Sequence, residues 1–337
     1  MSNLKTNYLG IELKNPIIVG ACGLTSDVQH LKKMEEAGAA AIVYKSLFEE
    51  QIQLENLELE QSLNAYDERH AEMLRLFPGL DHAGPEEFLH DLSKAVKSVS
   101  IPVFASLNAV YDETWPEWAA RLEKTGVAGL ELNFYQAVTS FEDTAKEIVD
   151  KRVEIISEVK KHLKIPVVAK LSPYYTNPLH VVKKMDSANA DGFVLFNRLF
   201  QPDIDIEKVA HVYPYNFSNP DDHRLSLRYI GLLHGNIKGD LCAANGISDY
   251  ADVIRMILAG ANTTQIVSTL YKNGISYISD ILTGIEDWMV RHNYKSIDEF
   301  RGKLSHKMLK DPFAYKRAQY VDILMKSDKI LKDFPVL

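Results

Sequence analysis

Lys170 is the residue whose position most directly suggests chemistry, because it closes a short apolar run. The run comprises residues 165–169, and Leu171, Ser172 and Pro173 follow the lysine. Burying an ammonium group costs free energy unless an anionic group meets it. Lys170 is therefore a candidate for binding an anionic ligand. The alternative is that its charged end extends into solvent at the rim of a sheet.

Seven further apolar runs of similar length also end in small or polar residues. These end residues are Ala21, Cys22, Gly23, Lys45, Ser46, Asn108, Asn133, Asn197, Arg198, Asn245, Gly246, Ser268 and Thr269. A single asparagine after a strand is usually a turn former, so only the whole set points to a binding site. Amides donate and accept hydrogen bonds, which suits a planar heterocycle with alternating carbonyl and N–H edges. The two lysines suit an anionic group or a negatively charged reduced cofactor.

The runs themselves predict the elements that position these side chains. Four segments share the order charged helical stretch, small-residue turn and apolar run; they are residues 35–45, 123–133, 186–197 and 258–268. Four more apolar runs lie within residues 16–20, 101–108, 165–172 and 239–246. Helical spacing of apolar residues occurs between them, at 27–37, 85–99, 115–125, 141–163, 179–188, 224–235, 248–258 and 275–291.

This alternation predicts the fold. Strand-length runs that are apolar on both faces, separated by helices, are typical of a parallel sheet covered by helices. Eight such units favour a closed (β/α)8 TIM barrel of the α/β class, forming one domain over residues 1–337. An open, doubly wound sheet is the alternative.

Two segments exceed what such a barrel needs, residues 48–84 after the second strand and residues 200–222 after the sixth. Both follow the carboxyl ends of strands, the face on which barrel enzymes build their active sites, so we expect these insertions to be substrate loops or lids. The tail, residues 293–337, is predicted to be helical and to serve in packing or in oligomer formation.

Gly246, Ser268 and Thr269 follow the seventh and eighth predicted strands. Barrels often bind phosphate at this place, through backbone N–H groups and a helix N-terminus. A heterocycle with a phosphate tail therefore fits the expected pocket, and FMN is the first candidate. For Gly246 alone, a simple tight turn is an equal alternative.

Composition excludes several classes of protein. The formal charge of −8, without a block of lysine and arginine, argues against binding to nucleic acid. No apolar run approaches the ~18 residues of a membrane span, and the first ten residues lack the apolar core of a signal peptide. Cys22 and Cys242 are too few for a disulfide framework or for the four thiolates of an iron–sulfur cluster. We expect a cytoplasmic protein without a metal site.

At these residues the chain resembles the dihydroorotate dehydrogenase family of FMN-dependent barrels, from residue 9 to the region of Ser268. The most distinctive stretches are residues 9–16, 45–52, 131–133, 168–173 and 194–205. The resemblance is closest to the class 1-like bacterial branch called dihydroorotate dehydrogenase-like. It implies oxidation of dihydroorotate, or of a related small anionic substrate, by hydride transfer to FMN in pyrimidine biosynthesis. Homodimers are common in the cytosolic branch, so a homodimer is expected.

The resemblance also implies a role for each matching residue. The cofactor would be bound by Ala21, Cys22, Gly23, Lys45, Ser46, Asn108, Asn133, Lys170, Asn245, Gly246, Ser268 and Thr269. Lys170 would stabilise negative charge on the reduced flavin. Gly246, Ser268 and Thr269 would hold the phosphate. Lys45, Asn133 and Asn197 would bind the substrate. Beyond the matching positions, Arg198 is a further candidate for substrate binding, and the candidate catalytic residues are Lys45, Tyr135 and Gln136.

The loop that carries the catalytic base departs from the family pattern. The family has cysteine or serine three residues after the asparagine of the fourth strand, whereas this chain has Gln136 after Asn133. Glutamine is not a general base near neutral pH. Replacement bases are sought among Tyr135, Tyr174, Tyr175 and His82. Arg198 stands where the family has a small hydroxyl residue and could hold a substrate carboxylate in a two-point fork.

Two alternative functions remain open from the sequence. One is a flavoprotein of the same fold that acts on a different substrate. The other is a Schiff-base lyase in which Lys170 is the nucleophile.

Overall fold

A closed ring of eight parallel strands forms the centre of the computed structural model, which describes residues 3–53, 84–136, 138–214, 217–326 and 332. The strands are β3 (Ile17–Val19), β4 (Ala41–Val43), β6 (Val103–Asn108), β7 (Gly129–Asn133), β8 (Val167–Leu171), β9 (Gly192–Leu195), β12 (Asp240–Ala243) and β13 (Thr263–Ile266). Each pairs in parallel with its neighbours, and pairing of β4 with β6 closes the ring. The predicted (β/α)8 barrel is therefore confirmed.

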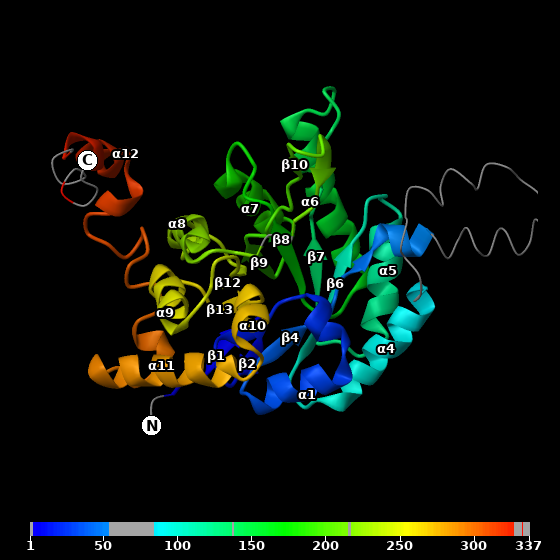
Figure 1. Ribbon diagram of the computed structural model, residues 1–337, viewed down its shortest axis with the longest axis horizontal. Helices are drawn as coiled ribbons and strands as arrows, with labels where there is room; N and C mark the ends of the chain where they lie inside the picture. Colours follow the sequence, from blue (N-terminus) through cyan, green and yellow to red (C-terminus); the bar gives the residue numbers. More distant parts are fainter. Residues whose placement is uncertain (1–2, 54–83, 137, 215–216, 327–331, 333–337) are drawn as a thin grey trace, which may run out of the picture.

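Helices follow the strands and cover the outside of the ring (Figure 1). They are α1 (Val28–Glu36), α4 (Pro85–Ser98), α5 (Thr114–Glu123), α6 (Ala145–His162), α7 (Pro178–Ser187), α8 (His223–Leu233), α9 (Tyr250–Ala259) and α11 (Tyr277–Arg291). Side-chain oxygens of polar residues fix several helix starts, because they accept hydrogen bonds from the first free backbone N–H groups. Asp27 caps α1, Thr144 caps α6 in a capping box with Glu147, and Asp249 caps α9.

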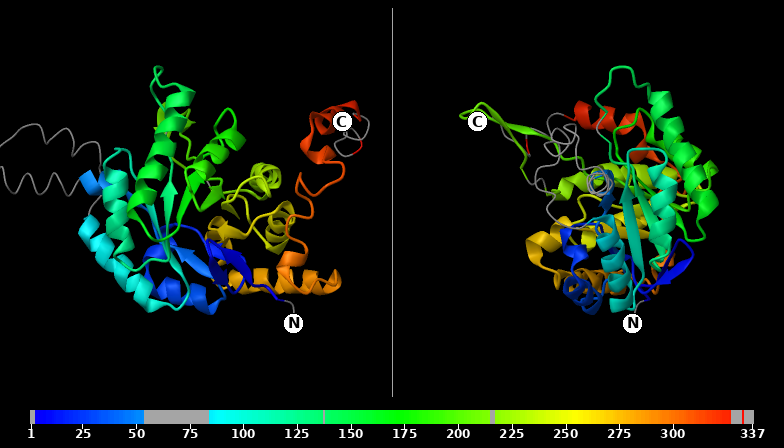
Figure 2. Two further views of the ribbon diagram at one scale, coloured as in Figure 1. Left: turned by 180° about the vertical axis from the view of Figure 1, so that it is seen from behind. Right: turned by 90° about the vertical axis from the view of Figure 1, so that its right-hand side faces the viewer.

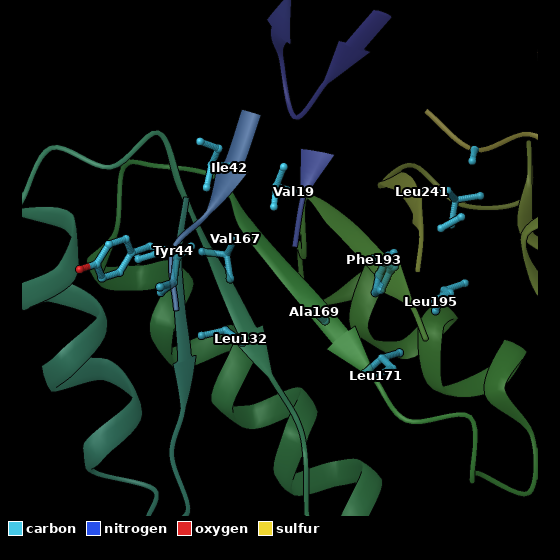
Figure 3. Packing of buried hydrophobic residues seen from close by; sticks show 14 of the residues in the cluster. Val19, Ile42, Tyr44, Leu132, Val167, Ala169, Leu171, Phe193, Leu195 and Leu241 are labelled. Carbon is cyan, nitrogen blue, oxygen red and sulfur yellow. The ribbon is translucent and has the colours of Figure 1, made fainter. Parts of the chain in front are cut away.

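The side chains of the strands alternate between two cores. Leu132, Val167 and Leu195 point outward and pack between the strands and the helices (Figure 3). Val168 and Val194 belong to a separate buried cluster inside the ring. Because successive side chains of a strand point to opposite faces, the residues next to the outward-facing apolar positions are directed into the barrel.

A short antiparallel hairpin, β1 (Thr6–Tyr8) and β2 (Ile11–Leu13), closes the amino-terminal end of the barrel. Tyr8 packs against Phe104 of β6, with ring centroids 6.2 Å apart. The backbone N–H of Leu9 donates to the Asp240 carboxylate over 2.6 Å at the start of β12. This end of the barrel is therefore plugged, and the opposite end is left for a binding site.

Several local features differ from the sequence expectation. The β1–β2 hairpin, a second hairpin of β10 (Asp203–Asp205) and β11 (Ala210–Val212), and the short helix α10 (Ser268–Asn273) were not predicted. The β10–β11 hairpin lies in the insertion between β9 and α8. Most of the other insertion, residues 48–84, lies outside the described residues, although its start forms β5 (Leu47–Phe48) beside β6.

The carboxyl-terminal region is only partly helical in its described residues. After α11 the chain forms the 3₁₀ turns η3 (Ile297–Glu299) and η4 (Phe313–Tyr315), followed by α12 (Arg317–Met325). Helix α12 buries none of its residues and lies at the edge of the molecule, away from the barrel (Figure 2). None of the described helices is both long enough and apolar enough to span a membrane.

Candidate functional site

A cavity of about 590 Å³ opens at the carboxyl ends of β3, β8, β9, β12 and β13. Nine residues predicted from the sequence line it, namely Ala21, Cys22, Gly23, Lys170, Asn197, Arg198, Asn245, Gly246 and Ser268. They come from five separate strand ends, and closure of the barrel brings them together. The predicted clustering of these side chains at one rim is therefore present in the structure.

Lys170 lies at the centre of a buried polar group. Its Nζ donates to Glu131 Oε1 and to Gln265 Oε1, both over 3.2 Å. Gln265 Nε2 donates to the other oxygen of Glu131 over 2.6 Å. Strand alternation accounts for this arrangement, because the apolar neighbours Leu130, Leu132, Ala169, Leu171 and Ile266 all face the outer core. The three polar side chains are therefore directed into the barrel.

Glu131 is the anionic group that a buried lysine requires. Only 8% of Lys170 and 3% of Glu131 are exposed, and a buried charge without a partner would be strongly destabilising. An ammonium group has three N–H donors, and two of them are used within this cluster of described residues. The third is left for a ligand in the cavity that Lys170 lines.

The roles of Glu131 and Gln265 were not predicted from the sequence. A signal for Gln265 was available, because β13 reads Thr-Thr-Gln-Ile and all four residues are buried. A polar residue in a strand that packs on both faces needs a polar partner. The identity of that partner could not be read from the sequence, since Gln265 and Glu131 are 134 positions apart.

Three asparagines connect the ends of β6, β7 and β9. Asn197 Nδ2 donates to Asn133 Oδ1 over 2.6 Å, which joins Asn133 to the cavity wall. Asn108 Nδ2 donates to the backbone carbonyls of Asn133 and Tyr135, over 2.7 and 3.1 Å. Asn108 therefore holds the chain at the end of β7, and its amide hydrogens are already engaged.

The turn after β12 shapes one wall of the cavity. Asn245 and Gly246 have φ angles of +71° and +73°, in the left-handed region that favours glycine. A Cβ atom on Gly246 would lie 2.2 Å from the backbone nitrogen of His223. Glycine is thus required here both by the turn and by the close approach of the chain before α8.

Ser268 and Thr269 begin the short helix α10, but only Ser268 lines the cavity. Ser268 Oγ accepts a hydrogen bond from the backbone N–H of Ser218 over 3.1 Å. Thr269 Oγ1 donates to the Ser248 carbonyl over 2.8 Å and accepts from Asn273 over 3.0 Å. The Thr269 hydroxyl therefore ties α10 to the segment before α9.

Cys22 and an aromatic pair line the mouth of the cavity. Burial raises the pKa of the Cys22 thiol above its usual value, so the neutral thiol is the main form near pH 7. The rings of Phe217 and Tyr271 stack with centroids 5.3 Å apart, and both line the cavity. The sequence analysis did not select this aromatic pair.

Lys45 and Ser46 follow β4 but do not line this cavity. Lys45 is exposed. The Ser46 hydroxyl is buried against the Ser106 hydroxyl, with 2.8 Å between the oxygens. The structure therefore places Lys45 at the rim and Ser46 inside the protein.

Tyr135 and Gln136 lie away from the cavity that holds Lys170. Gln136 is exposed and lines two other cavities, and Tyr135 lines one of them. The Tyr135 hydroxyl accepts from the backbone N–H of Phe200 over 3.3 Å. Tyr174 is 69% exposed, and His82 lies outside the described residues. The structure does not single out a base among these candidates.

Arg198 is paired within the protein. Its guanidinium forms an ion pair with Asp222 and donates to Asn245 Oδ1 over 3.3 Å. It still lines the cavity, and a guanidinium group has five N–H donors. A ligand carboxylate would therefore share Arg198 with Asp222.

The cavity fits a planar heterocycle with an anionic tail. Its volume falls within the ~300–1,000 Å³ of typical ligand pockets. Aromatic and apolar residues supply walls for a ring system; they are Phe196, Phe217, Ile247, Val267 and Tyr271. Lys170 and Arg198 supply positive charge, and Asn197 and Asn245 supply amide donors and acceptors. Among the described residues, no cluster of side chains suits a metal ion.

Comparisons with known proteins agree with this picture. Residues 3–289 match the family model described as dihydroorotate dehydrogenase. The protein named "Dihydroorotate dehydrogenase B (NAD(+)), catalytic subunit" is 28% identical in Thermoplasma volcanium, over 90% of this chain and 98% of that protein. Proteins of the same name are 27% identical in Pyrococcus abyssi, over 89% and 98%, and 26% identical in Alkaliphilus metalliredigens, over 90% and 99%. The chain therefore belongs to the dihydroorotate dehydrogenase family.

Proposed function

We propose that this protein is an FMN-dependent oxidoreductase that oxidises dihydroorotate, or a related small anionic substrate, in pyrimidine biosynthesis. The observation that carries the proposal is Lys170, which lines a 590 Å³ cavity and is oriented by Glu131 and Gln265. Membership of the dihydroorotate dehydrogenase family supports the same reaction class. A bound flavin would supply hydride acceptance and electron storage.

The chain's own residues would bind and orient the flavin. Lys170, with one N–H free of partners among the described residues, would donate to an electron-rich edge of the ring and stabilise negative charge there. Asn133 and Asn197 would present amide groups beside it. Gly246 and Ser268, at adjacent strand ends, would meet the phosphate through backbone N–H groups. Phe217 and Tyr271 would exclude water from the mouth of the cavity.

The substrate proposal is broader than dihydroorotate for a chemical reason. Removing a proton from the substrate requires a general base within hydrogen-bond reach. Gln136, at the position of the family's base, has no basic group, and its exposed side chain lies outside the Lys170 cavity. We therefore expect dihydroorotate to be oxidised slowly, or a related anion to be the better substrate.

Anaerobic titration of the purified protein tests this proposal. The protein should be yellow and release FMN on denaturation, and its visible flavin absorbance should bleach on adding an oxidisable substrate. Dihydroorotate and other small cyclic acids would be compared as reductants. A colourless protein that does not bind added FMN would refute the flavin assignment. A flavoprotein that dihydroorotate does not reduce would refute only the substrate.

The lyase alternative is disfavoured by the surroundings of Lys170. A Schiff-base nucleophile must be an uncharged amine. Nζ of Lys170 instead donates to Glu131 and to Gln265, both over 3.2 Å in a buried setting, so this nitrogen is already engaged as a hydrogen-bond donor. Lys170 is thus better suited to electrostatic stabilisation than to covalent catalysis.

We also propose that the chain works with a partner subunit. The relatives named above are each called a catalytic subunit, which implies a second subunit in those proteins, and their names include NAD(+). This favours a partner polypeptide over the expected homodimer, with NAD(+) as the final electron acceptor. Light scattering would give about 76 kDa for a homodimer, twice the chain mass of 38.1 kDa. That mass, together with NAD(+) reduction by the isolated chain, would contradict a need for a partner.

A further inference from the structure

A second cavity, of about 600 Å³, lies beside α6 and α7 at the carboxyl end of β8. The two helices are neighbours on the outside of the barrel (Figure 1). None of its lining residues also lines the cavity around Lys170. This α6–α7 cavity is therefore separate from the proposed flavin site.

Arg152 of α6 lines the α6–α7 cavity and is the unusual residue in it. It is only 7% exposed. Its guanidinium carbon lies 5.1 Å from the centre of the Tyr175 ring and 5.9 Å from that of Phe134. Within the described part of the chain, its side chain forms neither a hydrogen bond nor an ion pair. Buried charges are normally paired, and none of the described residues supplies an anionic partner for this one.

Tyr175 adds an independent observation on the same wall. Its ring lies against Arg152, and its hydroxyl oxygen is buried without a hydrogen-bond partner in the part of the chain that the structure describes. Buried polar atoms nearly always have a partner, from the protein or from a bound molecule. Two side chains in contact, one a cation and the other a hydroxyl donor, therefore both lack an acceptor among the described residues, and both residues line this cavity.

Nearby carboxylates do not neutralise Arg152. Asp150 is held by Lys146 and Lys184, both over 2.6 Å, and these contacts lower its pKa to about 2. Glu147 accepts from the backbone N–H and the hydroxyl of Thr144, over 3.1 and 2.6 Å. The pKa of Arg152 is lowered to about 10 by burial.

The remaining lining defines the kind of molecule that fits. Lys146 and Lys184 also line the cavity, and both form ion pairs with Asp150. The apolar part of the wall consists of Ile148, Val149, Val181 and Leu199. A planar guanidinium matches a carboxylate or a phosphate in a two-point contact. The cavity thus combines an oxyanion-binding group with apolar walls.

We propose that the α6–α7 cavity binds a small molecule that carries a carboxylate or phosphate on an apolar or aromatic body, with Arg152 and the Tyr175 hydroxyl as its polar contacts. This site is independent of the flavin assignment. It lies at the carboxyl end of β8, on the same side of the barrel as the Lys170 cavity.

Calorimetric titration of the purified protein with benzoate, phenyl phosphate and benzamide tests the proposal. Benzoate or phenyl phosphate should bind, and the neutral benzamide should bind at least tenfold more weakly, because the guanidinium needs an anion. The better of the two anions identifies the acidic group. Arg152→Met should weaken its binding roughly ten- to hundredfold, the range expected for hydrogen bonds to a charged group. Saturating FMN should not displace it.

Two further variants distinguish a direct effect on anion binding from a general effect on protein stability. Arg121→Met removes another arginine stacked on an aromatic ring, 3.9 Å from the Trp118 centroid and outside this cavity, and should leave binding unchanged. Tyr175→Phe keeps the ring contact with Arg152 and removes only the unpartnered hydroxyl. It should weaken binding roughly two- to tenfold without lowering the melting temperature.

The proposal is overturned if neither anion binds better than benzamide. It is also overturned if the Arg152 and Tyr175 variants bind the anion as the unaltered protein does, even where Arg152→Met lowers the melting temperature. That result would make the arginine a purely structural contact between Phe134 and Tyr175. Displacement of the probe by FMN would instead assign the binding to the Lys170 cavity.

Discussion

At the scale of single residues, Lys170 is a buried charge whose desolvation is offset by partners within the protein. Its burial would be unfavourable alone, but Glu131 and Gln265 supply two acceptors at 3.2 Å. Burying an ion pair contributes little net stability compared with apolar residues of similar size. We infer that the pair is retained for its charge, which is oriented toward the cavity.

Removing one partner of this ion pair should therefore lower the free energy of unfolding much more than removing both partners. Lys170→Met leaves the Glu131 carboxylate buried and unpaired, and should lower the free energy of unfolding by about 3–5 kcal/mol. The double variant Lys170→Met/Glu131→Met should regain most of that stability. Urea denaturation measures both values.

Measuring FMN binding distinguishes a structural role of the Lys170–Glu131 pair from a role of Lys170 in binding the cofactor. If Lys170 also binds the cofactor, the double variant should be well folded and still lose FMN affinity. Full FMN binding by the stable double variant would show that the ion pair has only a structural role.

Gln136 is the second residue-scale test. Gln136→Cys should leave the rate of flavin reduction by dihydroorotate unchanged, because the exposed side chain at this position lies outside the Lys170 cavity and a thiolate there is not placed to take the proton. A much faster rate would instead place this position beside the substrate. General-base catalysis contributes roughly 10²–10⁴-fold, and single-turnover stopped-flow absorbance measures the rate. Gln136→Ala is the matched control and should not speed the reaction. Equal rates for the two variants would mean that this position does not face the substrate.

At the scale of elements, the site is assembled from strand ends and the short turns that follow them. The turn at Asn245 and Gly246 after β12 and the start of α10 after β13 form adjacent walls of the cavity. Each turn has its own local requirement. Asn245 and Gly246 adopt positive φ angles, and α10 is tied to the preceding segment through Thr269.

Comparing a substitution at Gly246 with one at Gly274, outside this turn, separates the steric cost of an added Cβ from the cost of a positive φ angle. Gly246→Ala should lower the free energy of unfolding by roughly 2–4 kcal/mol, since the added Cβ meets the His223 backbone and the residue is held at φ +73°. Gly274→Ala has a similar φ of +86° but no atom within 4 Å of the new Cβ. It should cost only about 1–2 kcal/mol. Thermal or urea unfolding gives both values, and equal losses would refute the steric explanation.

At the scale of the whole molecule, barrel closure separates a protected interior from an open carboxyl-terminal face. The β1–β2 hairpin covers one end, and the cavity opens at the other. The two cysteines report on these environments. Cys242 of β12 is fully buried, whereas Cys22 lines the cavity and is partly exposed.

Thiol reactivity should therefore reflect the state of the fold. The thiolate is the reactive form, and burial raises the pKa of Cys22 and raises that of Cys242 to about 12. In the native protein we expect slow modification of Cys22, with a rate that still increases above pH 9, and none of Cys242. Added FMN should protect Cys22, and denaturant should expose both thiols. A chromogenic disulfide reagent measures each rate; rapid reaction of two thiols in the native state would contradict the buried position of Cys242.

The sequence by itself determined the alternation of strands with helices and the composition of the rim, whereas closure of the sheet into a barrel is shown by the structure. Eight runs that are apolar on both faces, alternating with amphipathic stretches, can bury their surfaces only as a parallel sheet inside a layer of helices. The polar residues that end these runs must then meet at one edge. Local signals did not reveal the β10–β11 hairpin, whose short strands, Asp203–Asp205 and Ala210–Val212, lack an apolar run.

Only the tertiary structure decided which polar groups are partners. Glu131, Lys170 and Gln265 lie on three different strands, and barrel closure and side-chain alternation bring them within hydrogen-bond distance. The same holds for Arg152 and Tyr175, which come from a helix and a loop and meet in a cation–π contact. Sequence patterns report which face a side chain occupies, because that depends on its own strand or helix. Which polar side chains form hydrogen bonds with one another depends on segments far apart in the chain. Only the packed tertiary structure determines these pairs.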